Sequence, residues 1–166
     1  MFAKWFQLWF LCTSISSAAT PQAQDDGAED FQVRCNSIAS TLHIEHTNVF
    51  FSQFIATGTN LSLPENNATC GATSQVVPAD ICRIALYVAT SNSSGVNMEA
   101  WLPSNWTGRF LATGNGGLNG CVGYADMAYG SSLGFASVGT NNGHNGTSGG
   151  AFYNSPEVVA DFAYRS

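Results

Sequence analysis

A glycine-rich stretch near the middle of the chain has the composition of a loop that works through its backbone. Gly114, Gly116, Gly117 and Gly120 lie within seven residues, directly after the apolar residues 110–112. Residues 110–112 are expected to form a buried strand, and glycines after a strand allow positive φ and close approach to another group. Backbone N–H groups in such loops stabilise the oxyanion of acyl transfer. The stretch therefore predicts an oxyanion loop, with an ordinary turn as the alternative.

A second motif contains a serine. Gly130, Ser132 and Gly134 match the pattern G-x-S-x-G, which requires the serine on a sharp turn from a strand into a helix. Here a helix is expected before the serine and a strand after it, so the order is reversed. We therefore interpret Ser132 as part of a helix end. No spacing rule supports a triad of Ser132 with His144 and Asp161, because triads assemble in space.

The histidines offer one candidate site residue. His43 and His46 are three residues apart, but no cysteine or acid joins them with ligand spacing, so no metal site is expected. His144 follows an expected parallel strand, at the position where open α/β sheets collect ligand-binding groups. We expect His144 to line a pocket; the alternative is a loop histidine with a structural hydrogen bond.

The charge of the chain is low and scattered. Charged residues make up 10% of the 166 residues, the net charge is −6, and the five lysines and arginines are spread along the sequence. Nucleic-acid binding needs clustered basic residues, so no nucleic-acid partner is expected. The hydrophobic fraction of 45% favours a folded domain over a disordered chain.

The N-terminus has the pattern of a secretory signal peptide. Lys4 supplies positive charge, residues 5–12 are mostly apolar, and residues 17–19 are small. The apolar stretch is too short to span a bilayer, so no membrane attachment is expected. We expect a signal peptide over residues 1–19, a flexible leader over residues 20–30 and a secreted domain over residues 31–166.

Cysteines and sequons agree with secretion. Cys12 leaves with the signal, and the even set that remains can pair in three ways: Cys35, Cys70, Cys82 and Cys121. Five Asn-x-Ser/Thr sequons are candidate glycosylation sites, at Asn60, Asn67, Asn92, Asn105 and Asn145.

Hydrophobic patterning supplies the elements that position these groups. Strands are expected over residues 48–55, 81–89, 98–102, 110–112 and 135–140, and helices over residues 31–42 and 124–133. Residues 59–78 are expected to be a loop. Ser155 as N-cap, followed by Pro156 and Glu157, predicts a further helix. This order indicates the start of an α/β domain whose later strands are missing.

Five segments carry a resemblance to a known family. In order they read FQVRCNSI, ADICRI, EAWLPSNWTGRFLATGNGGLNGCV, GFASVGTNNGH and SPEVVADFAYRS. At these spacings they resemble the N-terminal part of the tannase and feruloyl esterase family. The resemblance implies an α/β-hydrolase fold with a lid domain inserted later in the chain. It also implies secretion and hydrolysis of aromatic esters, such as hydroxycinnamic esters on plant cell-wall polysaccharide.

The family's catalytic serine, in Gly-Cys-Ser-x-Gly-Gly, and its aspartate and histidine motifs do not occur in these residues. We therefore expect the chain as given to be an inactive fragment without a triad residue. No cofactor is expected either, because the family's calcium site belongs to the lid domain.

The resemblance assigns roles to several residues. It makes Gly116 or Gly117 the donor of one oxyanion-hole N–H, and it places Gly143 and His144 in a loop that faces the site. We expect Asn115, Gly143 and His144 to line the pocket. It also implies that Cys35 pairs with Cys82 and that Cys70 pairs with Cys121.

A function of another class is a secreted module without catalytic activity that binds phenolic or carbohydrate ligands. Aromatic residues could form its surface: Trp101, Trp106, Tyr124, Tyr129 and Tyr153. A small active esterase using Ser132 is the third hypothesis.

Overall fold

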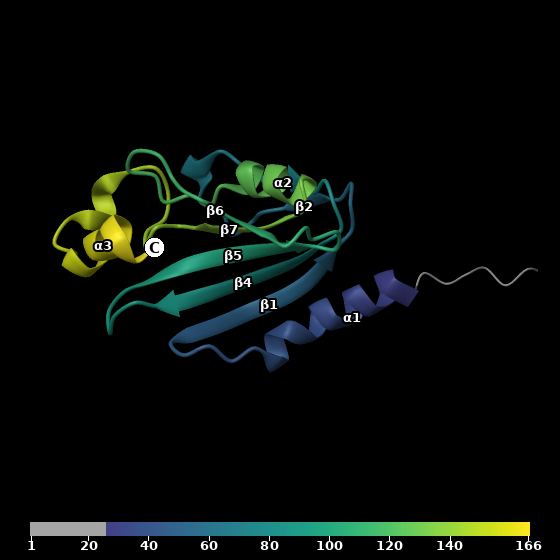
Figure 1. The fold of residues 1–166 in the computed structure, drawn as a ribbon. Helices are drawn as coiled ribbons and strands as arrows, with labels where there is room; N and C mark the ends of the chain where they lie inside the picture. The colour runs from purple at the N-terminus through teal and green to yellow at the C-terminus, as the bar shows by residue number, and fades with distance from the viewer. Residues whose placement is uncertain (1–25) are drawn as a thin grey trace, which may run out of the picture.

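The computed structural model describes residues 26–166, and the expected signal peptide therefore lies outside the described residues. Its centre is a five-stranded sheet with the spatial order β1-β4-β5-β7-β6 (Figure 1). Helix α1 (Asp26–Thr41) lies on one face and helix α2 (Tyr124–Ser132) on the other. Within residues 26–166, no helix is long and apolar enough to cross a membrane.

Three antiparallel strands form the first half of the sheet. Strand β1 (Thr47–Ile55) pairs with β4 (Ile81–Ala89), and β4 pairs with β5 (Gly95–Pro103) in a hairpin. All three were predicted from their apolar patterns, with bounds within a few residues. A register shift in β1 near Phe50 marks a bulge.

The second half of the sheet contains a parallel crossover. Strand β6 (Arg109–Thr113) continues through the glycine loop into α2 and returns as β7 (Phe135–Thr140), which lies between β5 and β6. The strand predicted over residues 110–112 is confirmed, but its predicted burial is wrong, because Phe110 is 65% exposed. The reason is position: β6 is the last strand of the sheet, so only β7 flanks it.

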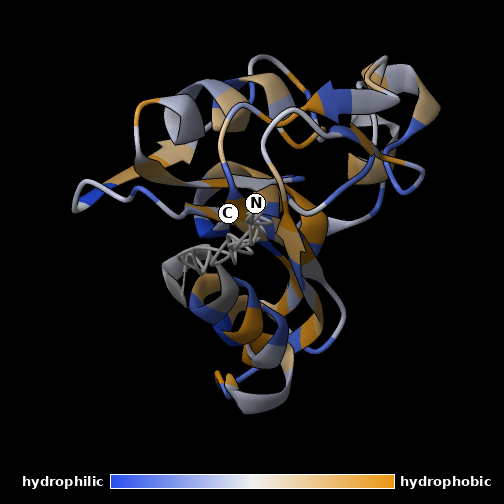
Figure 2. Cartoon of the chain, turned by 90° about the vertical axis from the view of Figure 1, so that its right-hand side faces the viewer, coloured by the Kyte–Doolittle hydropathy of each residue, from blue (hydrophilic) through white to orange (hydrophobic). Residues whose placement is uncertain are grey.

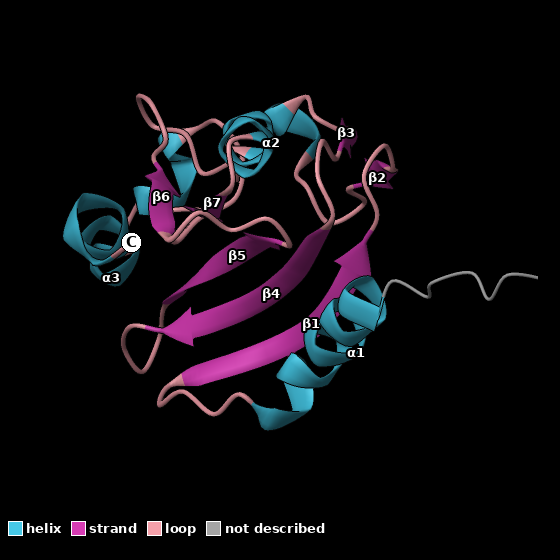
Figure 3. Ribbon diagram, turned by 45° about the vertical axis from the view of Figure 1, so that its right-hand side comes forward, coloured by secondary structure: helices cyan, strands magenta, loops and turns pink. Residues whose placement is uncertain are grey.

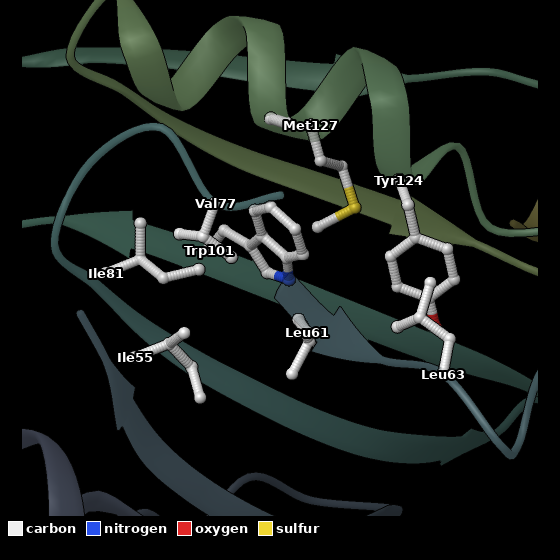
Figure 4. Packing of buried hydrophobic residues seen from close by; sticks show 9 residues of the cluster. Ile55, Leu61, Leu63, Val77, Ile81, Trp101, Tyr124 and Met127 are labelled. Atoms are coloured by element: carbon white, nitrogen blue, oxygen red, sulfur yellow. The ribbon is translucent and has the colours of Figure 1, made fainter. Parts of the chain in front are cut away.

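Two apolar cores hold the layers together. One lies between the sheet and α2 and is centred on Trp101, which packs with Met127 and Tyr124 of α2 (Figure 4). The other lies under α1, where Cys35 contacts the strands and its disulfide to Cys82 fixes the helix to β4. Hydrophobic residues dominate the strands, whereas α1 alternates between hydrophobic and hydrophilic ones (Figure 2).

Two stretches differ from the sequence-based expectation. Helix α1 begins at Asp26, so residues 26–30 of the expected leader are helical. Residues 59–78 were predicted to be a loop but contain a small hairpin of β2 (Asn60–Ser62) and β3 (Ser74–Val76), with the 3-10 helix η1 (Ala68–Cys70) between them. Strands of three residues are too short to show an alternating pattern. Leu61, Leu63 and Val77 nevertheless fill the core beside α2.

The C-terminal segment folds beside the carboxyl end of β7 (Figure 3). It comprises the 3-10 helix η2 (Gly149–Phe152), helix α3 (Pro156–Ala160) and one π-helical turn, η3 (Asp161–Arg165). The predicted start of α3 is confirmed, with Ser155 at the N-cap position and Pro156 in the first turn. The Ser155 side chain makes no capping hydrogen bond, and its hydroxyl donates to the carbonyl oxygen of Tyr153.

Candidate active site

The glycine loop borders an open hollow at the carboxyl end of β6. The hollow has a volume of about 300 Å³, and Gly114, Asn115, Gly116 and residues at the start of α2 line it. Gly117 has φ +60°, a conformation that favours glycine. Within the part of the chain that the structure describes, the N–H groups of Gly116 and Gly117 donate no hydrogen bond. The loop therefore contains two N–H groups without an acceptor among the described residues, and one of these residues, Gly116, lines the hollow.

Four contacts fix this loop from behind. The Asn115 amide donates to the carbonyl oxygen of Thr140 (3.0 Å), at the end of β7. The Asn142 amide donates to the carbonyl oxygen of Asn119 (3.3 Å). Farther along, the N–H of Gly120 donates to the carbonyl oxygen of Gly146 (2.8 Å), and Cys121 forms a disulfide with Cys70. The loop is thus attached to β7 and to the β2–β3 hairpin, and its free donors are held in place.

His144 lies behind the loop and lines neither this hollow nor the larger one described below. It is 5% exposed, and its ring packs on Phe152 and Phe162 with centroid separations of 4.8 and 5.8 Å. A Cβ atom added to Gly120 would lie 2.7 Å from its Nδ1. Burial lowers the pKa of His144 from its usual value. The structure therefore places this imidazole as packing under the loop.

Gly143 is also part of this support. Its φ is +79°, and an added Cβ would lie 2.5 Å from the Cβ of Asp161. Asp161 is fully buried, and its Oδ1 accepts from the hydroxyl of Thr90 (2.5 Å) and from Arg165 (3.4 Å). Gly143 thus permits close packing between the loop after β7 and η3.

Ser132 is not assembled with these groups. Its hydroxyl is exposed and donates to the carbonyl oxygen of Tyr129. It precedes the six-residue strand β7, whereas His144 follows it, which separates them by about 20 Å. The structure does not bring Ser132, His144 and Asp161 together, in agreement with our reading of the serine motif as a helix end.

A buried charge network positions the helix that follows the loop. The Arg83 guanidinium donates to both carboxylate oxygens of Glu99 (2.8 and 2.5 Å) and also to Glu65. Glu99 further accepts from the Tyr124 hydroxyl (2.8 Å) and from the Trp101 indole (3.1 Å). Tyr124 is the first residue of α2, so this network fixes the start of the helix against β4 and β5.

The network shifts the pKa values of its members. Burial, together with the nearby Glu99 carboxylate, raises the pKa of Tyr124 far above its usual value. Burial alone would lower the pKa of Arg83, but its hydrogen bonds and ion pairs with Glu99 and Glu65 outweigh this and raise it. Both groups therefore keep their protons at neutral pH.

Sequence reasoning missed this network, although a signal was present. Arg83 and Glu99 each stand in an otherwise apolar strand, and a buried charge requires a partner.

A larger hollow, of about 350 Å³, opens on the other side of Tyr124. Phe50 and Phe51 form one wall, and asparagines form much of the rest: Asn66, Asn67, Asn97, Asn141 and Asn145. All five sequon asparagines are exposed, and two of them, Asn67 and Asn145, lie at this hollow.

The aromatic surface considered for a binding module is not present as a unit. Trp101 and Tyr124 are buried in the core, so these two assignments to the surface are wrong. Trp106, Tyr129 and Tyr153 are exposed. Trp101 and Tyr124 can be buried because the indole N–H and the phenol hydroxyl each donate a hydrogen bond to Glu99 within the core.

The disulfides agree with the resemblance. Cys35 joins Cys82, and Cys70 joins Cys121, with Cα–Cα distances of 5.4 and 5.7 Å.

Comparison with known proteins shows similar chains. An esterase from Aspergillus oryzae with a known crystal structure is 58% identical, with a TM-score of 0.80, over 81% of this chain and 27% of that chain. The crystal structure of feruloyl esterase B from Aspergillus oryzae is 51% identical, with a TM-score of 0.79 and the same coverage. A probable feruloyl esterase B-2 of Aspergillus terreus is 54% identical over 157 residues, which are 95% of this chain and 29% of that protein.

These likenesses confirm the predicted fold class, the first strands and helices of an α/β-hydrolase fold. The chain spans less than a third of the length of the relatives it matches. The sequence profile described as "Tannase and feruloyl esterase" matches residues 82–166, half of the chain, and the chain therefore belongs to the tannase and feruloyl esterase family.

Proposed function

We propose that this chain supplies the oxyanion loop of a secreted carboxylic ester hydrolase that cleaves hydroxycinnamic esters of plant cell-wall polysaccharide. The observation that carries the proposal is the glycine loop at the carboxyl end of a parallel strand, where Gly116 lines an open hollow and neither Gly116 nor Gly117 donates its N–H to a described residue. Ligand-binding groups of open α/β sheets gather at this end. The names of the relatives, feruloyl esterases, supply the substrate class.

In the proposed reaction a serine attacks the ester carbonyl carbon, and the negative charge moves to the carbonyl oxygen. The N–H of Gly116 or Gly117 donates to this oxygen, and the second donor is the residue after the serine. One such donor lowers the barrier by about 3 kcal/mol. Collapse of the intermediate expels the alcohol and leaves an acyl-serine, which water hydrolyses.

The serine, its base and its acid are supplied by polypeptide outside these 166 residues. No Ser–His pair is in hydrogen-bonding contact among residues 26–166, and the chain alone is expected to release no ferulate from methyl ferulate. Secretion and glycosylation belong to the same proposal. They are supported by the N-terminal pattern, the two disulfides and the exposed sequons.

The test joins this chain to the remaining sequence of the Aspergillus oryzae esterase and measures kcat on methyl ferulate. Gly116→Pro removes one N–H and is expected to lower kcat by about 100- to 1,000-fold. Proline is not placed at Gly117, because it cannot adopt the φ of +60° found there. Gly116→Ala is the control, because it keeps the N–H and its Cβ meets no atom within 4 Å. Unchanged kcat in the Gly116→Pro variant would contradict the proposed role of the Gly116 N–H.

A module without catalytic activity is the second candidate, and the 350 Å³ hollow favours it. Phenylalanine rings and several amide side chains suit an uncharged ring with hydroxyl groups. Calorimetric titration of the chain with ferulic acid and with xylo-oligosaccharides tests this candidate. Binding that Phe50→Ala abolishes would support it, and absence of heat with both ligands would remove it.

A further inference from the structure

The five sequon asparagines share a feature of their side chains. Their carboxamide nitrogens, Nδ2, donate no hydrogen bond to any of residues 26–166, and all five residues are exposed. Other asparagines use this nitrogen to hold the fold together: Asn66, for example, donates to the carbonyl oxygen of Ala72 (2.7 Å). An N-linked sugar is attached through Nδ2. The fold therefore leaves all five attachment atoms without a partner among the described residues.

Two of these sequons, which begin at Asn67 and Asn145, contact each other. The Asn67 Oδ1 accepts from the N–H (3.0 Å) and the hydroxyl (2.8 Å) of Thr69, the last residue of its sequon. The Thr69 hydroxyl oxygen accepts in turn from the N–H of Thr147 (3.1 Å), the last residue of the other sequon. The Asn145 Oδ1 accepts from the amide of the buried Asn141 (3.0 Å). Both carboxamides are thus held by their oxygens, and their Nδ2 atoms remain available for a sugar.

Both asparagines lie at the hollow of about 350 Å³, which has an aromatic wall. Successive residues of a strand normally point to opposite faces, but the bulge of β1 leaves Phe50 unpaired, and both Phe50 and Phe51 line the hollow. Phe50 is 55% exposed. The charged side chains that line the hollow are Glu65 and Glu99, and each is paired with Arg83. The hollow therefore offers an exposed aromatic ring beside amide groups, with its charges paired.

N-acetylglucosamine, the first sugar of an N-glycan, suits this lining. One face of its ring presents C–H groups, which pack on aromatic rings, and its hydroxyls and acetamide can pair with amide side chains. A sugar on either asparagine begins at the rim of the hollow, because its C1 atom is bonded to Nδ2. We propose that the first sugars of the N-glycans on Asn67 and Asn145 cover the hollow and pack on Phe50.

The attachment itself is an ordinary glycosyl transfer. It bonds Nδ2 to C1 of the sugar, breaks the bond from C1 to the pyrophosphate oxygen of a lipid-linked oligosaccharide, and releases the lipid pyrophosphate and the Nδ2 proton. The inference rests on the glycosylation proposed above and does not depend on the glycine loop. A free phenolic or carbohydrate ligand is the competing occupant. The attached sugar is favoured because its effective concentration at the hollow is about millimolar without any binding from solution.

Site-resolved removal of the glycans from the folded protein tests the inference. The chain is secreted from a fungal host, and mass spectrometry of its peptides measures how fast peptide N-glycosidase releases each glycan. Release from Asn67 and Asn145 is expected to be at least about 10-fold slower than release from Asn92 and Asn105, which do not line the hollow. Phe50→Ala is expected to bring the four rates within about 3-fold of one another. The same rates are expected in the chain joined to the remaining sequence of the Aspergillus oryzae esterase.

The outcomes separate packing from glycosylation. Equal rates at the four sites of the native protein would overturn the inference and leave the proposed glycosylation standing. Absence of sugar at Asn67 and Asn145 would overturn both for these two sites. Calorimetric binding of ferulic acid or a xylo-oligosaccharide to the glycosylated chain, abolished by Phe50→Ala, would assign the hollow to a free ligand and would also overturn the inference.

The melting temperature gives a second readout. Phe50→Ala is expected to lower it by about 4 °C or more in the glycosylated chain, and by less than about 2 °C when combined with Asn67→Asp and Asn145→Asp. Aspartate removes the sugar and keeps the Oδ1 acceptor. Asn92→Asp with Asn105→Asp is the matched control, because it removes two sugars and adds the same charge away from the hollow, and the full shift should remain there. Equal shifts in the two aspartate backgrounds would contradict the inference.

Discussion

At the scale of single residues, the support of the glycine loop depends on groups that are buried rather than exposed. His144 was selected from the sequence as a pocket residue because it follows a parallel strand. The strand and its direction are confirmed, but the sequence could not show which way the side chain points after it. Phe152 and Phe162, which enclose the ring, come from a segment whose path no local pattern predicts.

The burial of His144 predicts a pH dependence of stability. Its pKa is lowered in the folded chain, so below about pH 6.5 the unfolded chain binds more protons than the folded chain. The contribution of neutral His144 to the free energy of unfolding is therefore complete above about pH 6.5 and is lost as the pH falls. The free energy of unfolding then decreases by at most about 1.4 kcal/mol per pH unit. His144→Phe is expected to remove this slope, as measured by urea denaturation from pH 5 to pH 7. An unchanged slope in the variant would show that His144 is not the titrating group.

Glu99 is the residue on which the buried network depends. Glu99→Gln removes the bidentate partner of Arg83 and leaves Glu65 as its remaining charged partner, so the cost is expected to be at most the about 3–5 kcal/mol of an unpaired buried charge. Tyr124→Phe is the control, because it removes one hydrogen bond to Glu99 and keeps the ring, at a cost of about 1–2 kcal/mol. Urea denaturation measures both variants. A glutamine variant no less stable than the phenylalanine variant would contradict this account.

At the scale of elements, the sequence predicted what hydrophobic patterns can encode. Strands β4 and β5 carry long apolar runs, and their hairpin was predicted. Strands β2 and β3 were not, because three polar-flanked residues have no period. The exposure of the β6 side chains could not be predicted either. The apolar residues 110–112 fit a central strand and an edge strand equally well. The glycine loop was found from composition, but the contacts of Asn115 and Asn142 that fix it join segments from both halves of the crossover.

The two disulfides have separable effects on these elements. Cys70–Cys121 joins the η1 segment to the end of the glycine loop, and Cys35–Cys82 joins α1 to β4. Replacing either pair by serine is expected to cost about 2–4 kcal/mol of stability. Only the Cys70→Ser/Cys121→Ser protein is expected to expose residues 114–123 to faster hydrogen exchange. If residues 114–123 exchange equally fast in the Cys35→Ser/Cys82→Ser protein, the effect of the Cys70–Cys121 disulfide on the glycine loop is not local.

At the scale of the whole molecule, the position of β7 determines the order in which the strands of the sheet can pair. Strand β7 is made after β6 but lies between β5 and β6. During synthesis, β1, β4, β5 and the Cys35–Cys82 disulfide can form before β7 has been made. Strand β6 has no strand to pair with until β7 has been synthesised. The glycine loop gains its anchors at Thr140 and Gly146 only afterwards.

Maturation of the loop is therefore expected to be a late event of biosynthesis. A chain ending at Leu133 should resist trypsin and chymotrypsin across β1, β4 and β5, yet be cut readily between residues 105 and 123. The 166-residue chain should be protected in both regions. Equal resistance of that stretch in the two chains would mean that the loop matures without the strand inserted beside it.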